Sequence, residues 1–306
     1  VAGKESIDVK LEDDNTTLND VVVIGYGTMK KKDLTGSVAS IGSKELADIP
    51  VSSVGEAMTG KLAGVNITTT EGSPDADIKI RVRGGGSLSQ DNSPLYIVDG
   101  FPVSSISDIA PSEIETIDVL KDASSTAIYG ARGANGVIIV TTKSGKEGKT
   151  QVSFGASLGF KKMAKETKVM DPYNYALYQY EVGNTEYGDY DDMEIWKDDL
   201  FGRTGLQQIY NVAVNGGTKE TKYNISYART DDKSIMKASD YTKDNINAKL
   251  NSKLNKWLTL DFNARLAYTK INGLGSGADT NESNASNSIV AKTVTFRPVD
   301  PLFISG

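Results

Sequence analysis

The chain has 306 residues, of which 38% are hydrophobic and 24% charged, so it is long enough for two folded domains and does not have a disordered composition. Its net charge of −6 argues against nucleic-acid binding, which needs a strongly basic surface. Cysteine and histidine are both absent, which excludes disulfides, thiolate metal sites, cysteine nucleophiles and the histidine-dependent triads and zinc motifs.

The apolar runs of the chain are short. The longest are 21–24 and 136–140, and neither approaches the roughly 18 residues that a membrane-spanning helix needs. A helical membrane protein is therefore excluded. A transmembrane β-barrel stays open, because its strands alternate apolar and polar residues and so have only a mild mean hydropathy.

The N-terminal segment carries one alternating apolar pattern, at Ile7, Val9 and Leu11, followed by the turn-forming run 12–15. This pattern predicts a single strand, so we expect residues 1–20 to be the end of an N-terminal β domain. The β-branched run 21–24 follows, between turn-forming residues and a basic cluster. Residues 21–33 are therefore predicted to be a β-prone segment with a linker.

Residues 34–149 show a mixed pattern. The pattern predicts short helices at 54–62, capped by Ser52 or Ser53, and at 124–129, ended by Gly130. Between and around them it predicts strands at 78–83, 95–98, 117–120 and 137–142. Together these elements indicate a compact α+β domain.

After Lys149 the pattern changes to strict alternation with one apolar face. Five strands are predicted, within 151–160, 210–214, 223–227, 245–254 and 258–268. The connections between them are in turn long, short, medium and short: 161–206, 216–218, 231–241 and 255–256. This order is typical of outer-membrane barrels, which have long external loops and short periplasmic turns.

A soluble β-sandwich is an equally good interpretation of the alternation alone. The polar faces favour the barrel, because they carry charged residues that suit a hydrated lumen: Lys249, Lys253, Asp261 and Arg265. Aromatic residues predicted at strand ends suit the girdles of such a barrel: Tyr210, Tyr223, Trp257 and Tyr268.

Several motifs occur in a fixed order along the chain. They are DVVVIGYG at 20–27, RVRG at 81–84, PLYIVDG at 94–100 and YGARGANGVIIVTTK at 129–143. In this order and spacing they resemble the SusC/RagA-type TonB-dependent outer-membrane transporters. The stretch from Arg203-Thr-Gly through Tyr210-Asn to Gly216-Gly-Thr resembles the first barrel hairpin of that family.

The resemblance implies an α+β plug domain followed by antiparallel strands of a transmembrane β-barrel, which in this family has about 22 strands. It assigns residues 21–33 to a TonB-box segment and linker, 34–149 to the plug and 150–306 to the first barrel strands and loops. Five strands, with a sixth possible from Ile289, leave open edges, so we expect the barrel to be incomplete in this chain and the chain to be part of a longer protein.

The function implied by the resemblance is TonB-dependent import of a glycan, an oligosaccharide or a peptide across the bacterial outer membrane, with the plug gating the barrel lumen. The N-terminus would be periplasmic, and the partners would be TonB, a SusD-like surface lipoprotein and outer-membrane lipid. No enzyme activity, cofactor or nucleic-acid partner is implied. The alternatives are a secreted or surface β-rich adhesion module and a carboxylate-based hydrolase.

Two groups of binding residues are predicted. The first, expected to bind TonB by adding a strand to its sheet, is Asp20, Val21, Val22, Val23, Ile24, Gly25 and Tyr26. The alternative is that 21–24 pairs inside the plug or an N-terminal domain. The second group lies in polar plug loops, 87–93 and 101–109, and is expected to face ligand: Ser87, Ser89, Gln90, Asp91, Asn92 and Phe101.

Three plug arginines, Arg81, Arg83 and Arg132, are expected to pair with carboxylates on the inner barrel wall, with anionic substrate as the alternative. The glycines near them lack the spacing of phosphate-binding loops and predict tight turns. An acidic cluster within 189–194 predicts a solvated external loop, with calcium binding as the less favoured alternative. No catalytic or metal-ligating residue is assigned.

Overall fold

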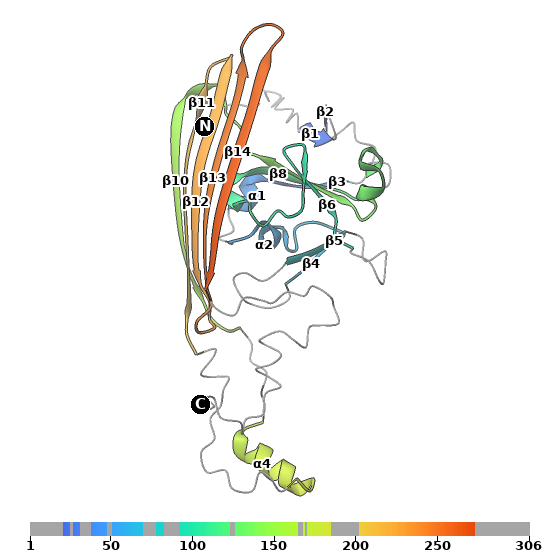
Figure 1. Ribbon diagram of the computed structural model, residues 1–306, viewed down its shortest axis with the longest axis vertical. Helices are drawn as coiled ribbons and strands as arrows, with labels where there is room; N and C mark the ends of the chain where they lie inside the picture. Colours follow the sequence, from blue (N-terminus) through green and yellow to red (C-terminus); the bar gives the residue numbers. More distant parts are fainter. Residues whose placement is uncertain are drawn as a thin grey trace, which may run out of the picture.

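The computed structural model describes residues 21–24, 27–30, 38–47, 51–69, 78–82, 92–122, 126–164, 168, 170–184 and 202–272. Most of them form two bodies. We call the first, residues 38–142, the α+β unit, and the second, strands β10 to β14, the long sheet. The α+β unit lies against one face of the long sheet (Figure 1).

The α+β unit is built on a five-stranded sheet in the order β3, β8, β9, β6, β7. Its strands are β3 (Val38–Gly42), β6 (Leu95–Val98), β7 (Phe101–Val103), β8 (Ile114–Leu120) and β9 (Val137–Thr142). β6 and β9 run parallel and the other neighbours are antiparallel. The predicted strands at 95–98 and 137–142 are confirmed, and the one at 117–120 begins three residues earlier.

Short helices and a small sheet complete the unit. They are α1 (Ser43–Ala47), α2 (Val54–Met58), β4 (Val65–Thr69) paired with β5 (Ile78–Val82), and the 3-10 helices η2 (Pro111–Glu113) and η3 (Ala127–Gly133). Ser53 caps α2, since its hydroxyl accepts a hydrogen bond from the Glu56 N–H at 3.1 Å. The short helix predicted up to Gly130 has the 3-10 form, and it does not end there: the 3-10 turns continue beyond this glycine, whose φ of 59° and ψ of −147° kink them.

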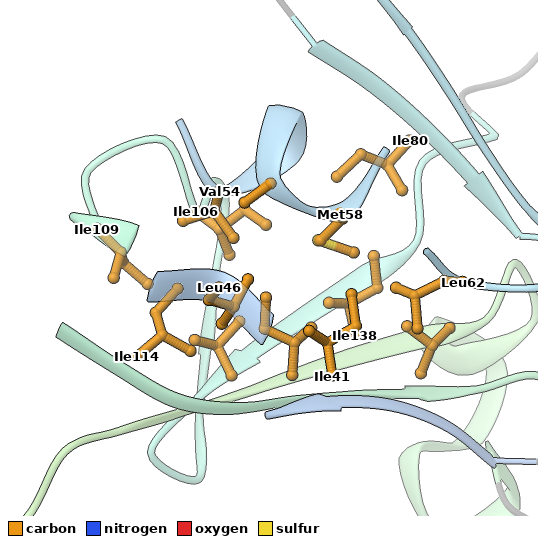
Figure 2. Packing of buried hydrophobic residues seen from close by; sticks show 14 of the residues in the cluster. Ile41, Leu46, Val54, Met58, Leu62, Ile80, Ile106, Ile109, Ile114 and Ile138 are labelled. Carbon is orange, nitrogen blue, oxygen red and sulfur yellow. The ribbon is translucent and has the colours of Figure 1, made fainter. Parts of the chain in front are cut away.

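Alternate residues of the central strands pack on opposite faces of this sheet. Ile117 and Ile138 belong to the larger core cluster, which α1 and α2 cover with Leu46 and Met58 (Figure 2). Their neighbours along the strands, among them Ile139, form a smaller cluster on the other face. Both faces of the sheet are therefore buried, which explains the nearly continuous apolar runs of these strands.

The long sheet has five antiparallel strands in chain order. They are β10 (Gly148–Lys161), β11 (Gly205–Gly217), β12 (Thr221–Lys233), β13 (Asp240–Lys253) and β14 (Thr259–Asn272). Tight turns join them at one end, and the other end carries the connection 234–239 and the longer one that contains α4 (Pro172–Glu181). All five strands are longer than predicted, so Tyr210 and Tyr268 lie inside strands and not at their ends.

The two faces of the long sheet have opposite character. The apolar set predicted for β10 is exposed, with Phe154 at 74%, whereas the polar residue Asn247 on the inward face of β13 is 1% exposed. A soluble sandwich buries its apolar face, and this sheet does the reverse. Apolar residues outward and polar residues inward are the arrangement of a membrane barrel wall.

The N-terminal part of the described chain forms a separate hairpin. β1 (Val21–Ile24) pairs antiparallel with β2 (Gly27–Lys30), and neither strand is paired with another described strand. Residues 27–30, predicted as part of a linker, are therefore a strand. The predicted strands at 7–11 and from Ile289 lie outside the described residues.

None of the helices within the described ranges is long and apolar enough to cross a membrane.

Candidate functional site

The inward face of β13 is the main contact between the two bodies. Its positions Lys243, Asn245, Asn247 and Lys249, which we call the contact row, alternate with outward residues and point to the α+β unit. Lys243 Nζ donates a hydrogen bond to the carbonyl of Ser107. The first residue of the contact row therefore binds the connection that follows β7.

Two further positions of the contact row bind the α+β unit directly. Asn245 Nδ2 donates to the carbonyl of Asp108. Lys249 Nζ lies 2.9 Å from Asp99 Oδ1 and also donates to the Thr142 carbonyl at 3.1 Å. Because successive inward residues meet successive parts of the α+β unit, the register of β13 fixes how the unit sits on the long sheet.

Asp99 occupies the tight turn between β6 and β7. Its φ is 50° and that of Gly100 is 90°, and an Asp-Gly pair tolerates these positive values best in a two-residue hairpin turn. The Asp99 N–H donates to the Val140 carbonyl at 3.0 Å, which attaches the turn to β9. The turn therefore directs the Asp99 side chain beyond the end of the sheet.

The carboxylate of Asp99 joins the two bodies. Within the α+β unit it accepts hydrogen bonds from the Thr142 N–H at 2.9 Å and the Thr142 hydroxyl at 2.7 Å. From the long sheet it accepts bonds from Lys249 Nζ at 2.9 Å and Asn263 Nδ2 at 2.8 Å, with Arg265 Nη2 at 3.7 Å. One carboxylate thus bonds to β9, β13 and β14.

This carboxylate is charged. Burial raises the pKa of Asp99, but the attraction of Lys249 and the hydrogen bonds from Lys249 and Thr142 outweigh the burial and hold the pKa below its usual 3.8. The side chains of Asp99 and Lys249 are 9% and 18% exposed, so water screens the pair only in part.

The connection from the α+β unit to β10 is held as well. Asn224 Nδ2 donates to the Lys143 carbonyl at 2.8 Å, and Asn215 Nδ2 donates to the Ser144 carbonyl at 2.9 Å. Asn215 Oδ1 also accepts from the Lys146 N–H at 3.0 Å. Two asparagines of β11 and β12 therefore attach this connection to the long sheet.

In the predicted arginine pairs the plug supplies the cation and the barrel wall supplies the carboxylate, whereas the contacts described above have the reverse arrangement. The α+β unit supplies the carboxylate, Asp99, and the long sheet supplies the cations Lys249 and Arg265. Arg81 lies half-buried on β5 and Arg132 is exposed in η3, while Arg83 lies outside the described residues. The pairing of the three arginines stays a prediction. Sequence reasoning missed Asp99, although the Asp-Gly turn in the motif at 94–100 was a signal for it.

The residues predicted to face ligand are only partly described. Phe101 is 72% exposed at the start of β7, and Asn92 is half-buried before β6. Ser87, Ser89, Gln90 and Asp91 lie outside the described residues, as does the acidic cluster within 189–194. The connection after β7 meets the long sheet through the Ser107 and Asp108 carbonyls, and its contact with ligand stays a prediction.

The predicted TonB-binding segment is described over Val21, Val22, Val23 and Ile24, which form β1. Asp20, Gly25 and Tyr26 lie outside the described residues. The pairing of β1 with β2 differs from the alternative considered above, in which the segment pairs inside the plug.

Comparison with known proteins identifies both bodies. Residues 30–137 match the TonB-dependent Receptor Plug Domain family. The TonB-dependent receptor SusC of Bacteroides thetaiotaomicron is 39% identical over 253 residues, which cover 78% of this chain and 25% of SusC. The TonB-dependent receptor P3 of Formosa agariphila is 39% identical over 227 residues, covering 74% of this chain and 22% of the relative. The chain thus spans about a quarter of the length of these relatives.

Solved structures show the same arrangement. The RagAB peptide importer in its open-open state matches with a TM-score of 0.74 and 28% identity, covering 85% of this chain and 33% of the other. Its closed-closed state matches with a TM-score of 0.70 and 27% identity, covering 81% and 32%. The α+β unit is therefore a plug and the long sheet is part of a barrel wall. The chain belongs to the SusC/RagA-type TonB-dependent receptors, a family of receptors and transporters and not of enzymes.

Proposed function

We propose that this chain forms the plug and first barrel strands of an importer that carries an oligosaccharide or peptide nutrient across the bacterial outer membrane, driven by TonB. The observation that supports this function is the contact between the α+β unit and the long sheet. Among the described residues this contact includes hydrogen bonds and the Asp99 ion pairs, made by the contact row and its neighbours.

A polar contact suits a gate. Each hydrogen bond contributes only about 0.5–1.5 kcal/mol net, because water can replace either partner when the contact opens. An apolar contact of similar extent would expose hydrophobic surface on every opening, at about 25 cal/mol per Å². The α+β unit can therefore leave the wall and return without large exposure of apolar surface.

The energy for opening would enter through the residues from Asp20 to Tyr26, which are proposed to bind TonB in the periplasm. The hairpin of β1 and β2 supports this role, because a two-stranded hairpin is only marginally stable by itself and offers a strand edge to a partner. A pull on this segment would act on the α+β unit through β3, the next described strand along the chain.

The apolar outer face of the long sheet supports a position in outer-membrane lipid. A SusD-like surface lipoprotein over the outer mouth of the barrel is proposed from membership of the SusC/RagA type. The substrate class is proposed on the same basis, with peptide supported by the similarity to the RagAB peptide importer and glycan by the family resemblance. Ligand would meet the loop from Ser87 to Asn92 and the exposed Phe101.

The experiment is made on the full-length transporter in cells. Deleting Asp20 to Tyr26 is expected to leave binding of labelled oligosaccharides or peptides at the cell surface unchanged and to abolish their uptake. A control variant replaces Lys31 and Lys32 by serine, which leaves both strands of the hairpin intact and should retain uptake. Normal uptake after the deletion would refute the assignment of this segment to TonB binding.

A further inference from the structure

The contact row has one position without a described partner. Lys243, Asn245 and Lys249 each bind the α+β unit, but Asn247 Oδ1, on a residue only 1% exposed, has no hydrogen-bond partner among the described residues. A buried polar atom left unpaired is destabilising, because it loses its hydrogen bonds to water and gains none in return. The unpaired oxygen in the middle of the contact row therefore calls for a hydrogen-bond donor.

The neighbours of Asn247 share this feature. In the register of the long sheet Asn247 lies between Ser226 on β12 and Arg265 on β14. Ser226 Oγ and Arg265 Nε are also buried without a partner in the described part of the chain. A single row across three strands thus presents one amide oxygen, one hydroxyl and one guanidinium N–H to the α+β unit.

Glu113, the last residue of η2, faces this row. It is 2% exposed, and neither carboxylate oxygen has a hydrogen bond to a described residue. Ser226, Arg265, Lys243 and the backbone of Ala110 all lie near enough to affect its ionisation, although neither the Ser226 hydroxyl nor the Ala110 N–H reaches hydrogen-bonding geometry. The unpaired atoms of the two bodies therefore meet at Glu113.

An ionised glutamate can accept from Ser226 and Arg265 but leaves Asn247 Oδ1 without a donor. A carboxylate offers only acceptors, and Asn247 Oδ1 is an acceptor too. A protonated Glu113 has an O–H that can donate to Asn247 Oδ1 and a carbonyl that can accept from Ser226 or Arg265. We propose that Glu113 makes the missing contact of the contact row in its protonated, neutral form, and that its ionisation weakens the attachment of the plug to the barrel wall.

The electrostatic surroundings agree with this geometry. Burial raises the pKa of Glu113 to about 7, although Arg265 and Lys243 lower it. Both cations also have other partners. Arg265 lies 3.7 Å from Asp99, and Lys243 is close to Asp108. Of the remaining charged groups on the neighbouring elements, the Lys143 ammonium donates to the Ser112 carbonyl, and Lys44 and Glu45 of α1 are exposed.

The direction of the pH effect follows from the two protonation states. A released Glu113 returns to an ordinary pKa of 4.5, whereas the docked residue has a pKa of about 7. Below pH 4.5 both forms are protonated and the contact is complete. Between pH 4.5 and about pH 7 the released form is ionised while the docked form keeps its proton, so docking weakens as the pH rises. Above about pH 7 both forms are ionised, and docking no longer changes with pH.

The test is hydrogen exchange on the full-length transporter in lipid vesicles. The opening equilibrium of the plug segment 104–113, corrected for the intrinsic pH dependence of exchange, should rise roughly tenfold to a hundredfold from about pH 5 to about pH 8. Glu113→Gln, which is neutral at every pH, should remove this rise. The matched control Glu115→Gln, at a half-exposed site beside Lys146, should keep it. A rise in Glu113→Gln equal to the wild-type rise would overturn the proposal.

A second variant decides the matter if Glu113→Gln does not assemble. Asn247→Ala removes the proposed acceptor, so the segment should open more at about pH 5 and nearly as in the wild type at about pH 8, which reduces the rise. An unchanged rise in Asn247→Ala would overturn the proposal by itself.

Discussion

Asp99 and Glu113 show how two carboxyl groups of one interface acquire opposite behaviour. Asp99 receives hydrogen bonds from Thr142, Lys249 and Asn263 and stays ionised. Glu113 is buried without such donors, and its pKa rises to about 7. Burial raises both pKa values, but at Asp99 the attraction of Lys249 and the hydrogen bonds to the charged form outweigh it, whereas at Glu113 burial outweighs the lowering by Arg265 and Lys243.

Asp99→Asn tests the charge of the first group. Asparagine fits the positive φ of this turn, so the backbone is retained while Lys249 loses its counter-ion. We expect local opening of segment 104–113, measured by hydrogen exchange at neutral pH, to become easier by roughly 2–4 kcal/mol, somewhat less than for a fully buried pair because Lys249 is 18% exposed. In the wild type, the stabilisation of docking by ionised Asp99 should disappear only as the pH falls below 3.8. The stabilisation by protonated Glu113, in contrast, is lost as the pH rises.

Asp118→Asn is the matched control for that measurement. Asp118 is a buried carboxylate that bonds to Ser40 and Thr116 within the α+β unit. This change should destabilise the pairing of β3 with β8 and leave the bonds to the long sheet in place. Equal opening of segment 104–113 in both variants would mean that Asp99 acts through the stability of the plug and not through its docking.

The sequence predicted individual side-chain contacts less well than it predicted the strands or the overall fold. The expected plug–wall pairs used arginines of the plug, but the described pairs use Asp99, which lies 150 residues from Lys249 in the chain. Local patterns carry no information about which charges meet over such a separation. The motif at 94–100 did indicate a turn with Asp99 and Gly100 at its centre, because Asp-Gly pairs favour this geometry.

At the scale of the element, β13 shows why alternation was a reliable signal. Its inward residues bind the α+β unit, and its outward residues, among them Ile246 at 46% exposure, belong to the apolar face. A shift of one residue would exchange the two faces and break every contact of the contact row. The strands were predicted for this reason, whereas their ends were not, since the hydrogen-bonded ladder continues into polar stretches such as 240–244.

The η3 segment was harder to predict. The pattern at 124–129 predicts a short helix that ends at Gly130, but the structure has 3-10 turns over Ala127–Gly133, with a kink at Gly130. Gly136, with a φ of 92°, has no room for a side chain, because an added Cβ would lie 2.8 Å from Val82. Tertiary contacts of this kind determine the local backbone conformation, and intrinsic helix propensity carries no information about them.

Ile246→Arg tests the membrane face of this strand. Ile246 lies near the middle of β13, so an arginine there should reduce the free energy of unfolding of the full-length barrel from lipid vesicles by about 2–4 kcal/mol. Leu260→Arg is the control, because Leu260 is exposed on the same face as Ile246 but near the end of β14, where the expected cost is only about 0–1 kcal/mol. Equal effects in the two variants would contradict a lipid-facing surface with depth dependence.

At the scale of the molecule, the order of the elements connects the N-terminal segment to the contact. A pull on β1 would act on β3, which pairs with β8, and β8 begins at Ile114, directly after Glu113. The proposed TonB-binding segment is therefore two strands away from the proposed protonatable contact. Movement of β8 would displace Glu113 before it separates Asp99 from Lys249, because Asp99 is held by β9.

Cross-linking the two bodies tests whether import requires the plug to leave the wall. Asp108→Cys with Asn245→Cys places one thiol on each side of a hydrogen-bonded contact, in a chain whose 306 residues contain no cysteine. A short reducible bismaleimide should then leave ligand binding intact, block uptake, and release the block on reduction. The control pair Thr221→Cys with Ser252→Cys joins β12 to β13 inside the wall, where the two hydroxyls are 2.7 Å apart, and its cross-link should not affect uptake. Uptake at the normal rate through a fully cross-linked Asp108–Asn245 pair would mean that substrate passes while this side of the plug stays attached, and the opening would then have to lie between the N-terminal strands of the α+β unit and the rest of the barrel.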